Sequence, residues 1–219
     1  VPAHATTGDR SASGEDDALG LVDGLFPCAT PRPTPCPGHC FQLVSLAQNF
    51  DNVVPPILPP DWLATNALGP PPLWVTSNSG VPTPPADTPP NAAFIDDPVM
   101  VSDKRLDSPN FLFFEVFGAR LTFRHNFNLE ASDTNANLGF DGGVLELSTD
   151  GGSTFQDIVA AGGGFLMGGY NRTISTDRGS PIAGHQAWSG TSGGFITTTV
   201  HAPSASPFTK FRWRVVSGK

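Results

Sequence analysis

Proline clusters break up the first half of the chain and exclude long helices from it. Three proline-rich segments follow closely on one another: VVPPILPPDW (53–62), GPPPLW (69–74) and VPTPPADTPPN (81–91). Proline has no backbone N–H to donate, so it is excluded from helix interiors and from central strands. We therefore expect stiff surface loops between short strands such as LWVTS and AAFI.

The second half carries the alternation of apolar and polar residues that is typical of β-strands. In ARLTFRHNFNLE (119–130), every second residue is apolar or aromatic, and the residues between them are polar. This pattern predicts a strand with one buried and one solvated face. His125 falls on the apolar face, which favours a buried core histidine over a metal ligand. FQLVSLAQNFD (41–51) carries apolar residues on both faces, which predicts a strand of a sandwich.

The segment FDGGVLELSTDGGSTFQDI (140–158) is rich in glycine and acidic residues, which raises the question of a phosphate or metal loop. A phosphate loop needs a following helix and usually a lysine, and an EF-hand needs flanking helices. Neither pattern is present. Asp150-Gly151-Gly152-Ser153 instead predicts a hairpin turn between two strands, because glycine readily takes the positive φ that such turns require.

Charge excludes one class of partner. The 219-residue chain has a formal net charge of −8, and only 15% of its residues are charged. It has no run of Lys or Arg to neutralise phosphates, so we expect no nucleic-acid partner. No stretch of about 18 continuous apolar residues occurs, so we expect no membrane-spanning segment.

Residues 1–40 form a different region, which we expect to be an extended arm, followed by a β domain over 41–219. The apolar stretch LGLVDGLF (19–26) is predicted to add as a strand to a sheet edge or to dock on a neighbour. Cys28, Cys36 and Cys40 allow a single disulfide bond within the chain and leave one thiol free or bonded to a partner. A zinc site formed by these three cysteines and His39 is the alternative.

The order of segments in the second half resembles the MAM-like β-sandwich module of bacterial secreted proteins. The resemblance is carried by FDGGVLELSTDGGSTFQDI, GGYNRTIS, AGHQAWSGTSGGFITTTVHAP and FRWRV, and more loosely by NFDNVVPPILPPDW. Such modules accompany immune-inhibitor-A-type metallopeptidases. The resemblance implies a jelly-roll sandwich of two antiparallel sheets, an extracellular location and a binding or adhesive role without catalysis. No HExxH, GxSxG or SxxK motif contradicts that expectation.

The resemblance also implies a structural calcium ion near the first strand. Asp51 matches the family's first acidic ligand, and Asp87 roughly matches a second. Asp97, in the acidic segment FIDDPVMVSD, is a further candidate because calcium prefers oxygen ligands. The family's closing strand, which carries another Asp, has no counterpart before Lys219. We expect that strand to lie outside this sequence, or its place to be filled by the arm or by a neighbouring chain.

Two functions remain open from sequence. The first is a secreted or cell-surface (exterior or periplasmic) structural or adhesive protein without catalysis. It would bind other protein subunits through its arm or an open sheet edge, including by strand addition. The alternative is a carbohydrate-binding or accessory module of an exported hydrolase. Trp188, with Tyr170 and His185 as companions, is the candidate sugar-stacking site for that alternative, and a core or hinge position is the other interpretation of Trp188.

Overall fold

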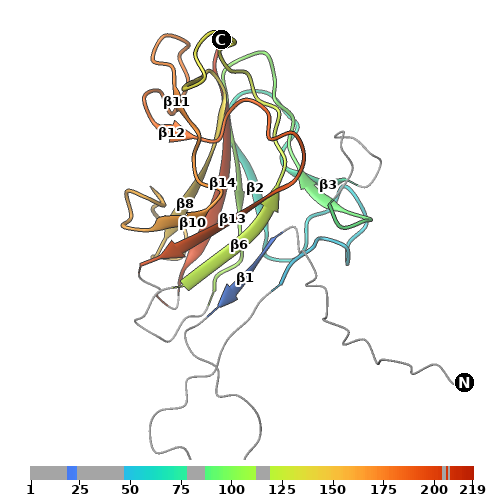
Figure 1. Ribbon diagram of the computed structural model, residues 1–219. Coiled ribbons are helices and arrows are strands. Elements are labelled where there is room, and N and C mark those ends of the chain that lie inside the picture. Colours follow the sequence, from blue (N-terminus) through green and yellow to red (C-terminus); the bar gives the residue numbers. More distant parts are fainter. Residues whose placement is uncertain (1–18, 24–46, 78–86, 112–118, 204–205, 207) are drawn as a thin grey trace, which may run out of the picture.

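The computed structural model describes residues 19–23, 47–77, 87–111, 119–203, 206 and 208–219. These residues form strands, turns and loops, with no α-helix. No helix within the described ranges is therefore long and apolar enough to cross a membrane. The predicted all-β class is confirmed, and the antiparallel sheets are consistent with a β-sandwich (Figure 1). Cys28, Cys36, Cys40 and most of the predicted arm lie outside the described residues.

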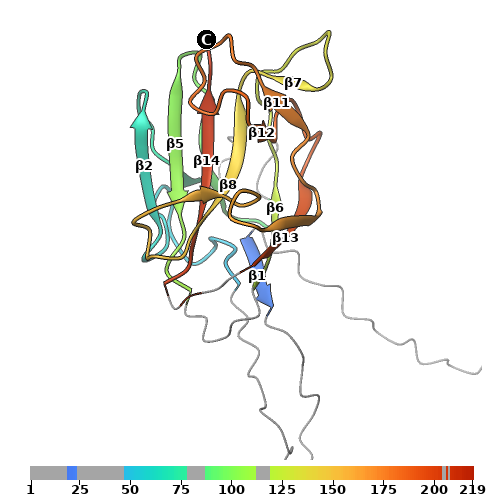
Figure 2. The ribbon, with the colours of Figure 1, turned by 90° about the vertical axis from the view of Figure 1, so that its left-hand side faces the viewer.

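Two larger sheets make up most of the structure. The first contains, in spatial order, β2 (Leu63–Leu68), β5 (Ser102–Asp107), β14 (Lys210–Ser217), β8 (Gly142–Ser148) and β9 (Gln156–Asp157). The second contains β1 (Leu19–Asp23), β6 (Ala119–His125), β13 (Ile196–Ala202) and β10 (Gly164–Met167). All neighbouring strands within these two sheets are antiparallel. Figure 2 shows the first sheet face-on, with β2 at its outer edge.

Two smaller sheets cover parts of this framework. One contains β12 (Gln186–Ala187), β11 (Arg172–Ile174) and β7 (Leu138–Gly139), with β11 and β7 parallel. The other pairs β3 (Val75–Ser77) with β4 (Ala92–Phe94). The predicted hairpin around Asp150 is confirmed, because β8 turns back to pair with β9. The Asp150 carboxylate accepts hydrogen bonds from Thr154 and Ser148, which fixes the turn.

The main core lies between the two larger sheets. It takes alternate residues from β6, β8, β13 and β14, as the sequence pattern predicts. Its fully or almost fully buried members are Phe50, Ala119, Leu121, Phe123, Leu145, Leu147, Ile158, Trp188, Val200, Ala202 and Phe211. A second, smaller cluster forms on the other face of the five-stranded sheet, where β11 and β12 pack against Val144 and Val216.

The strand predicted over residues 41–51 is not found in its described part, 47–51, which contains one isolated bridge and a bend instead. Local side-chain bonds explain this difference. Phe50 takes a positive φ of 65°, and its N–H donates to Oε1 of Gln48 at 2.7 Å. Asn49 and Asp51 bond each other in both directions. Such polar side chains compete with strand pairing for the backbone groups.

A chain of ion pairs crosses the outer face of the five-stranded sheet, away from the main core. Arg214 binds both carboxylate oxygens of Asp103, at 2.9 and 2.8 Å, and Oε1 of Glu146 at 2.8 Å. Arg212 binds both oxygens of Asp107, at 2.5 and 2.9 Å, and approaches Glu146 at 3.7 Å. Arg105 provides a second bidentate contact to Asp103. These side chains connect β5, β14 and β8 and balance one another in charge.

Candidate functional site

Two proline-rich segments that are far apart in sequence meet at one polar junction. We call this the junction site and define it as Asp51, Asp87, Thr88, Asn91 and Arg124. The bend around Asp51 supplies one side, and the segment that leads into β4 supplies the other. The backbone N–H of Asn91 donates to Oδ1 of Asp51 at 3.0 Å. Oδ2 of Asp51 accepts from Nδ2 of Asn49 at 2.6 Å.

Asn91 is the centre of this junction. Its side chain is 1% exposed, and its Nδ2 donates to the carbonyls of Phe50 at 2.7 Å and Val53 at 2.8 Å. Its Oδ1 is buried and accepts no hydrogen bond from the described residues, and the same is true of Oγ1 of Thr88. A buried oxygen without a partner costs free energy, so two such atoms in one segment need an explanation.

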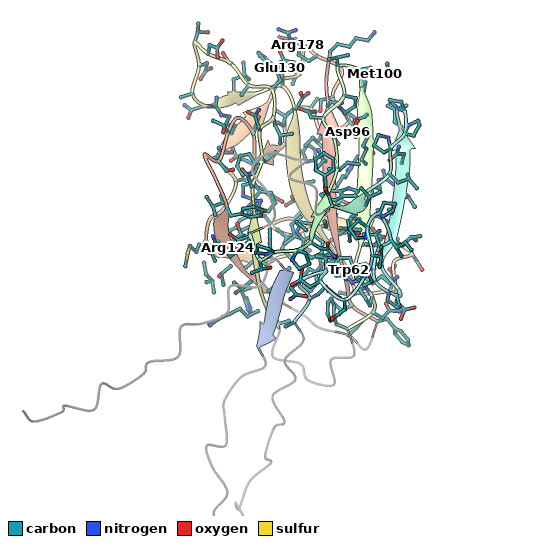
Figure 3. All side chains as sticks on the ribbon, turned by 90° about the vertical axis from the view of Figure 1, so that its right-hand side faces the viewer. Trp62, Asp96, Met100, Arg124, Glu130 and Arg178 are labelled. Atoms are coloured by element: carbon teal, nitrogen blue, oxygen red, sulfur yellow. The ribbon has the colours of Figure 1, made fainter. Side chains whose placement is uncertain are left out.

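Asp87 is held by the β6 strand. Its carboxylate accepts from Nε of Arg124 and, at 3.0 Å, from Nη2 of the same residue. Arg124 also donates to Oγ1 of Thr197 at 3.0 Å and to the Phe195 carbonyl at 3.3 Å. This contact fixes the segment before β4 to the four-stranded sheet, and Figure 3 places Arg124 and Trp62 on this lower half of the molecule.

The junction site fits a hard cation in part. The Asp51 carboxylate and the partnerless oxygens of Asn91 and Thr88 are the oxygen ligands that calcium prefers. Asp87 does not fit, because Arg124 already neutralises it. No three His, Cys, Asp or Glu side chains within the described ranges group around a common point. A cation here would therefore depend on amide, hydroxyl and carbonyl oxygens as well as on Asp51.

The third predicted calcium ligand, Asp97, lies elsewhere. It hydrogen-bonds the carboxyl of Asp141, whose Oδ1 also accepts from the Gly218 N–H at 2.5 Å. Desolvation of its carboxyl group, the charge of Asp141 and their hydrogen bond raise the pKa of Asp97 to about 7, although part of the side chain is exposed. Burial likewise raises the pKa of Asp141. Two carboxyls therefore share a proton near the C-terminal end of β14, separately from Asp51.

This carboxyl pair predicts a dependence of stability on pH. The folded pKa of Asp97 lies above the model-peptide value of 3.8, so the folded state holds a proton that the unfolded state releases. The free energy of unfolding should fall as pH rises from about 4 to 7. Asp97→Asn should remove this fall and stabilise the protein at pH 8 by about 1 kcal/mol, a value reduced for solvent screening of the exposed side chain. Urea unfolding at a series of pH values measures the free energy of unfolding of the wild type and the variant.

Asp133→Asn is the matched control for that experiment, because Asp133 is an exposed aspartate. It should keep the wild-type pH profile. An Asp97→Asn profile that is as steep as the wild-type profile between pH 4 and 7 would show that the two carboxyls do not share a proton.

The predicted sugar-stacking residues do not form an exposed platform. Trp188 is 3% exposed, and its ring packs edge-on against His125 and Tyr170, with centroids at 4.7 and 4.8 Å. Its Nε1 donates to the Gly168 carbonyl at 2.8 Å. The hydroxyl of Tyr170 donates to Asp157 at 2.6 Å, and burial together with the charge of Asp157 raises the pKa of Tyr170. His185 is exposed but contributes backbone bonds to the turn before β12.

His125 occupies the core position that the alternation predicts. Its ring lies beside Phe123 and Trp188, and its Nε2 is 2.9 Å from Oγ1 of Thr198. Burial lowers its pKa to about 3, so it is neutral at physiological pH. This histidine is a packed, hydrogen-bonded core residue.

Sequence reasoning missed Asn91, Thr88 and Arg124. The only signal for Asn91 is its place between two prolines and the apolar run AAF, where an Asn commonly ends a turn. Arg124 could be assigned to the wet face of its strand, but its partner could not be identified from the pattern. Asn171-Arg172-Thr173 matches the N-glycosylation sequon. In the structure, the Asn171 amide stabilises the fold, because it exchanges two hydrogen bonds with the Ser189 backbone.

Comparisons with protein-family models, with curated proteins and with solved structures find no match to this chain.

Proposed function

We propose that this chain is a non-catalytic, extracellular β-sandwich that binds protein partners by accepting an added strand at the edge formed by β6. One observation carries this proposal. Residues 19–23, which come from the N-terminal region, pair with β6 as an antiparallel edge strand, with Leu19 opposite Phe123 and Asp23 opposite Arg120. Strand addition gives affinity through main-chain hydrogen bonds, which any extended segment can provide.

The position of β1 supports an acceptor role for this edge. β6 is held on its other side by β13 along its whole length, from Ala119 opposite Ala202 to His125 opposite Ile196. β1 is shorter, and its register with β6 shifts between Leu19 and Val22. An irregular, short edge strand is easier to displace than a regular central one. The edge therefore suits exchange between the chain's own segment and a partner's.

The strand order supports a jelly-roll topology for the sandwich. β5 and β14 are neighbours in one sheet, and β6 and β13 are neighbours in the other. The chain thus passes from β5 to β6 and back from β13 to β14 as two adjacent crossings between the sheets. A jelly-roll topology would produce this order of neighbouring strands in the two sheets.

Val22→Pro in the full chain tests strand addition, because proline cannot donate to a strand ladder. The variant should bind a synthetic peptide covering residues 17–26 with a saturable dissociation constant, whereas the wild-type chain, with its edge occupied, should bind it at least about tenfold more weakly. Fluorescence anisotropy of the labelled peptide measures both. A peptide with the same Pro substitution is the control. Equal binding by variant and wild type would contradict the proposal.

We also propose that the junction site holds a calcium ion through Asp51, Asn91 and Thr88. The support is the buried side-chain oxygens of Asn91 and Thr88, which accept no hydrogen bond within the described residues, together with the bond from the Asn91 N–H to Asp51. The ion would neutralise Asp51 and tie the bend around Phe50 to the segment before β4. It would stiffen the structure that faces β6 through Arg124 and Asp87.

Calcium at about one hundred times its dissociation constant should stabilise the folded chain by about 2.7 kcal/mol, relative to the chain in EDTA. Differential scanning calorimetry with and without calcium measures the shift in unfolding temperature. Asp51→Asn should lose the shift, and Asp97→Asn should keep it. The reverse result would place calcium at the carboxyl pair of Asp97 and Asp141, and no shift in the wild type would exclude a calcium site.

A further inference from the structure

Lys104 is the one charged residue among the largest fully buried side chains of the described residues. It lies on the inner side of β5, in the alternation that also buries Ser102 and Leu106. Lysine is almost never fully buried without a partner. Its Nζ contacts the carboxylate of Asp96 and donates to the Pro72 carbonyl at 3.2 Å. The side chain of Lys104 is 0% exposed and that of Asp96 is 35% exposed.

Asn66 lies directly opposite Lys104 on the neighbouring strand, β2. Residues that are paired across antiparallel strands project from the same face, with Cβ atoms about 5 Å apart. The Asn66 amide also reaches the Pro72 carbonyl, at 3.4 Å, so this oxygen is shared with Lys104. Oδ1 of Asn66 is buried and accepts no hydrogen bond from the part of the chain that the structure describes.

An amine, an amide and a carboxyl group thus lie close together, around a fully buried Lys104 side chain. We propose that Lys104 and Asn66 are the reactants of an autocatalytic isopeptide bond that joins β5 to β2, with Asp96 as the group that moves the protons. The bond would covalently fix the outermost strand of the five-stranded sheet. This inference does not depend on strand addition at β6, which concerns the other sheet.

The chemistry needs no added reagent. The Lys104 ammonium first gives a proton to the Asp96 carboxylate that it contacts, which leaves a neutral amine as the nucleophile. Nζ then bonds to Cγ of Asn66 while Asp96 donates its proton to Oδ1. The proton released by Nζ passes through Asp96 to Nδ2, and the Cγ–Nδ2 bond breaks to release ammonia. Oδ1 returns its proton to Asp96 as the carbonyl re-forms, and Asp96 passes this proton to the ammonia, which leaves as ammonium. The partly exposed side of Asp96 offers it a route to solvent.

Proximity of the reacting groups would accelerate the reaction. Groups that are held in reactive geometry reach effective concentrations of about 10⁵ M or more, which makes a slow amide exchange feasible within a folded protein. The partnerless Oδ1 of Asn66 matters for the same reason. It is the atom on which negative charge develops, and in the proposed step Asp96, carried on the Lys104 amine, delivers the proton to it.

The test is the mass of the full, purified chain, measured after denaturation and complete reduction of the cysteines. We expect a mass below that of the sequence by one ammonia molecule. Protease digestion should yield a branched peptide that joins Lys104 to Asn66, which distinguishes the bond from a succinimide formed at another asparagine. A folded wild-type chain at full sequence mass, without the branched peptide, would overturn the proposal.

Three variants separate the roles. Asn66→Ala and Lys104→Arg should each show full mass, since one reactant is absent. Asn66→Asp should show a mass lower by one water molecule, because a carboxyl acceptor loses water instead of ammonia. A wild-type branched peptide that joins Lys104 to Asp96, with loss of water, would overturn the assignment of Asn66. If a variant fails to fold, the wild-type peptide map still decides.

Discussion

Replacing Arg214 with methionine is expected to lower the free energy of unfolding by about 3 kcal/mol, because it leaves two buried carboxylates without their main partner. Asp103 and Glu146 have side chains only 6% and 10% exposed, and Arg214 binds both. After the substitution, Glu146 retains only the 3.7 Å approach of Arg212. Urea unfolding at pH 7 followed by circular dichroism measures the loss.

Arg105→Met is the matched control, because Arg105 is the end of the ion-pair chain and is 28% exposed. We expect a loss of about 1 kcal/mol, as for an ion pair near the surface. Equal losses for the two variants would show that the ion pairs act singly and not as a connected chain.

The Arg214 effect should also depend on pH. Burial alone would raise the pKa of Asp103, but hydrogen bonds from Arg214 and Arg105 outweigh it and lower the pKa. The stabilisation that the Asp103 carboxylate gains from these arginines is present above its ordinary pKa of 3.8. It is lost as pH falls through the lower pKa of the folded state. The difference between wild type and Arg214→Met should therefore shrink below about pH 4. A constant difference down to pH 2 would contradict an electrostatic origin.

Trp188→Ala is expected to lower the free energy of unfolding by about 4 kcal/mol, within the range for removal of a buried aromatic ring. The ring contacts four other rings in the main core: those of Phe123, His125, Phe165 and Tyr170. Its removal leaves a cavity and leaves the Gly168 carbonyl without the indole N–H. Thermal and urea unfolding measure the effect.

Phe208→Ala is the control for that substitution, because Phe208 is an aromatic residue with 58% of its surface exposed. Its loss should change stability by no more than about 0.5 kcal/mol. If Trp188→Ala were as stable as Phe208→Ala, the ring would be at the surface and the sugar-stacking interpretation would regain its support.

The sequence allowed the β regions to be predicted where the alternation was long. The strand predicted over residues 119–130 is found over Ala119–His125. The half-buried ring of His125 packs against the core rings of Phe123 and Trp188, because the residue falls on the apolar face of that strand. The pattern failed at 47–51, where short polar side chains bond the backbone locally. The sequence left Trp188 open between an exposed ring and a core position, and its backbone bridge to Gly143 accompanies a buried ring.

The candidate site could be predicted only in part, because its contacts join residues that are distant in the chain. Asp51 was identified from the resemblance, but the oxygens that accompany it come from Thr88 and Asn91. Asp87 was assigned to calcium, yet its partner is Arg124, on a strand whose register no local pattern reveals. The same limit applies to Lys104 and Asn66, whose pairing follows from the order of β2 and β5.

Amide hydrogen exchange of β6 tests the central claim most directly. In the wild-type chain, the amides of Ala119–His125 that face β1 should exchange slowly, because they are paired. In Val22→Pro these amides should lose protection, while those of β13 and β14 keep theirs, and the peptide covering residues 17–26 should restore it. If β6 is equally protected in wild type and variant, and the peptide has no effect, the edge is not a strand-acceptor site.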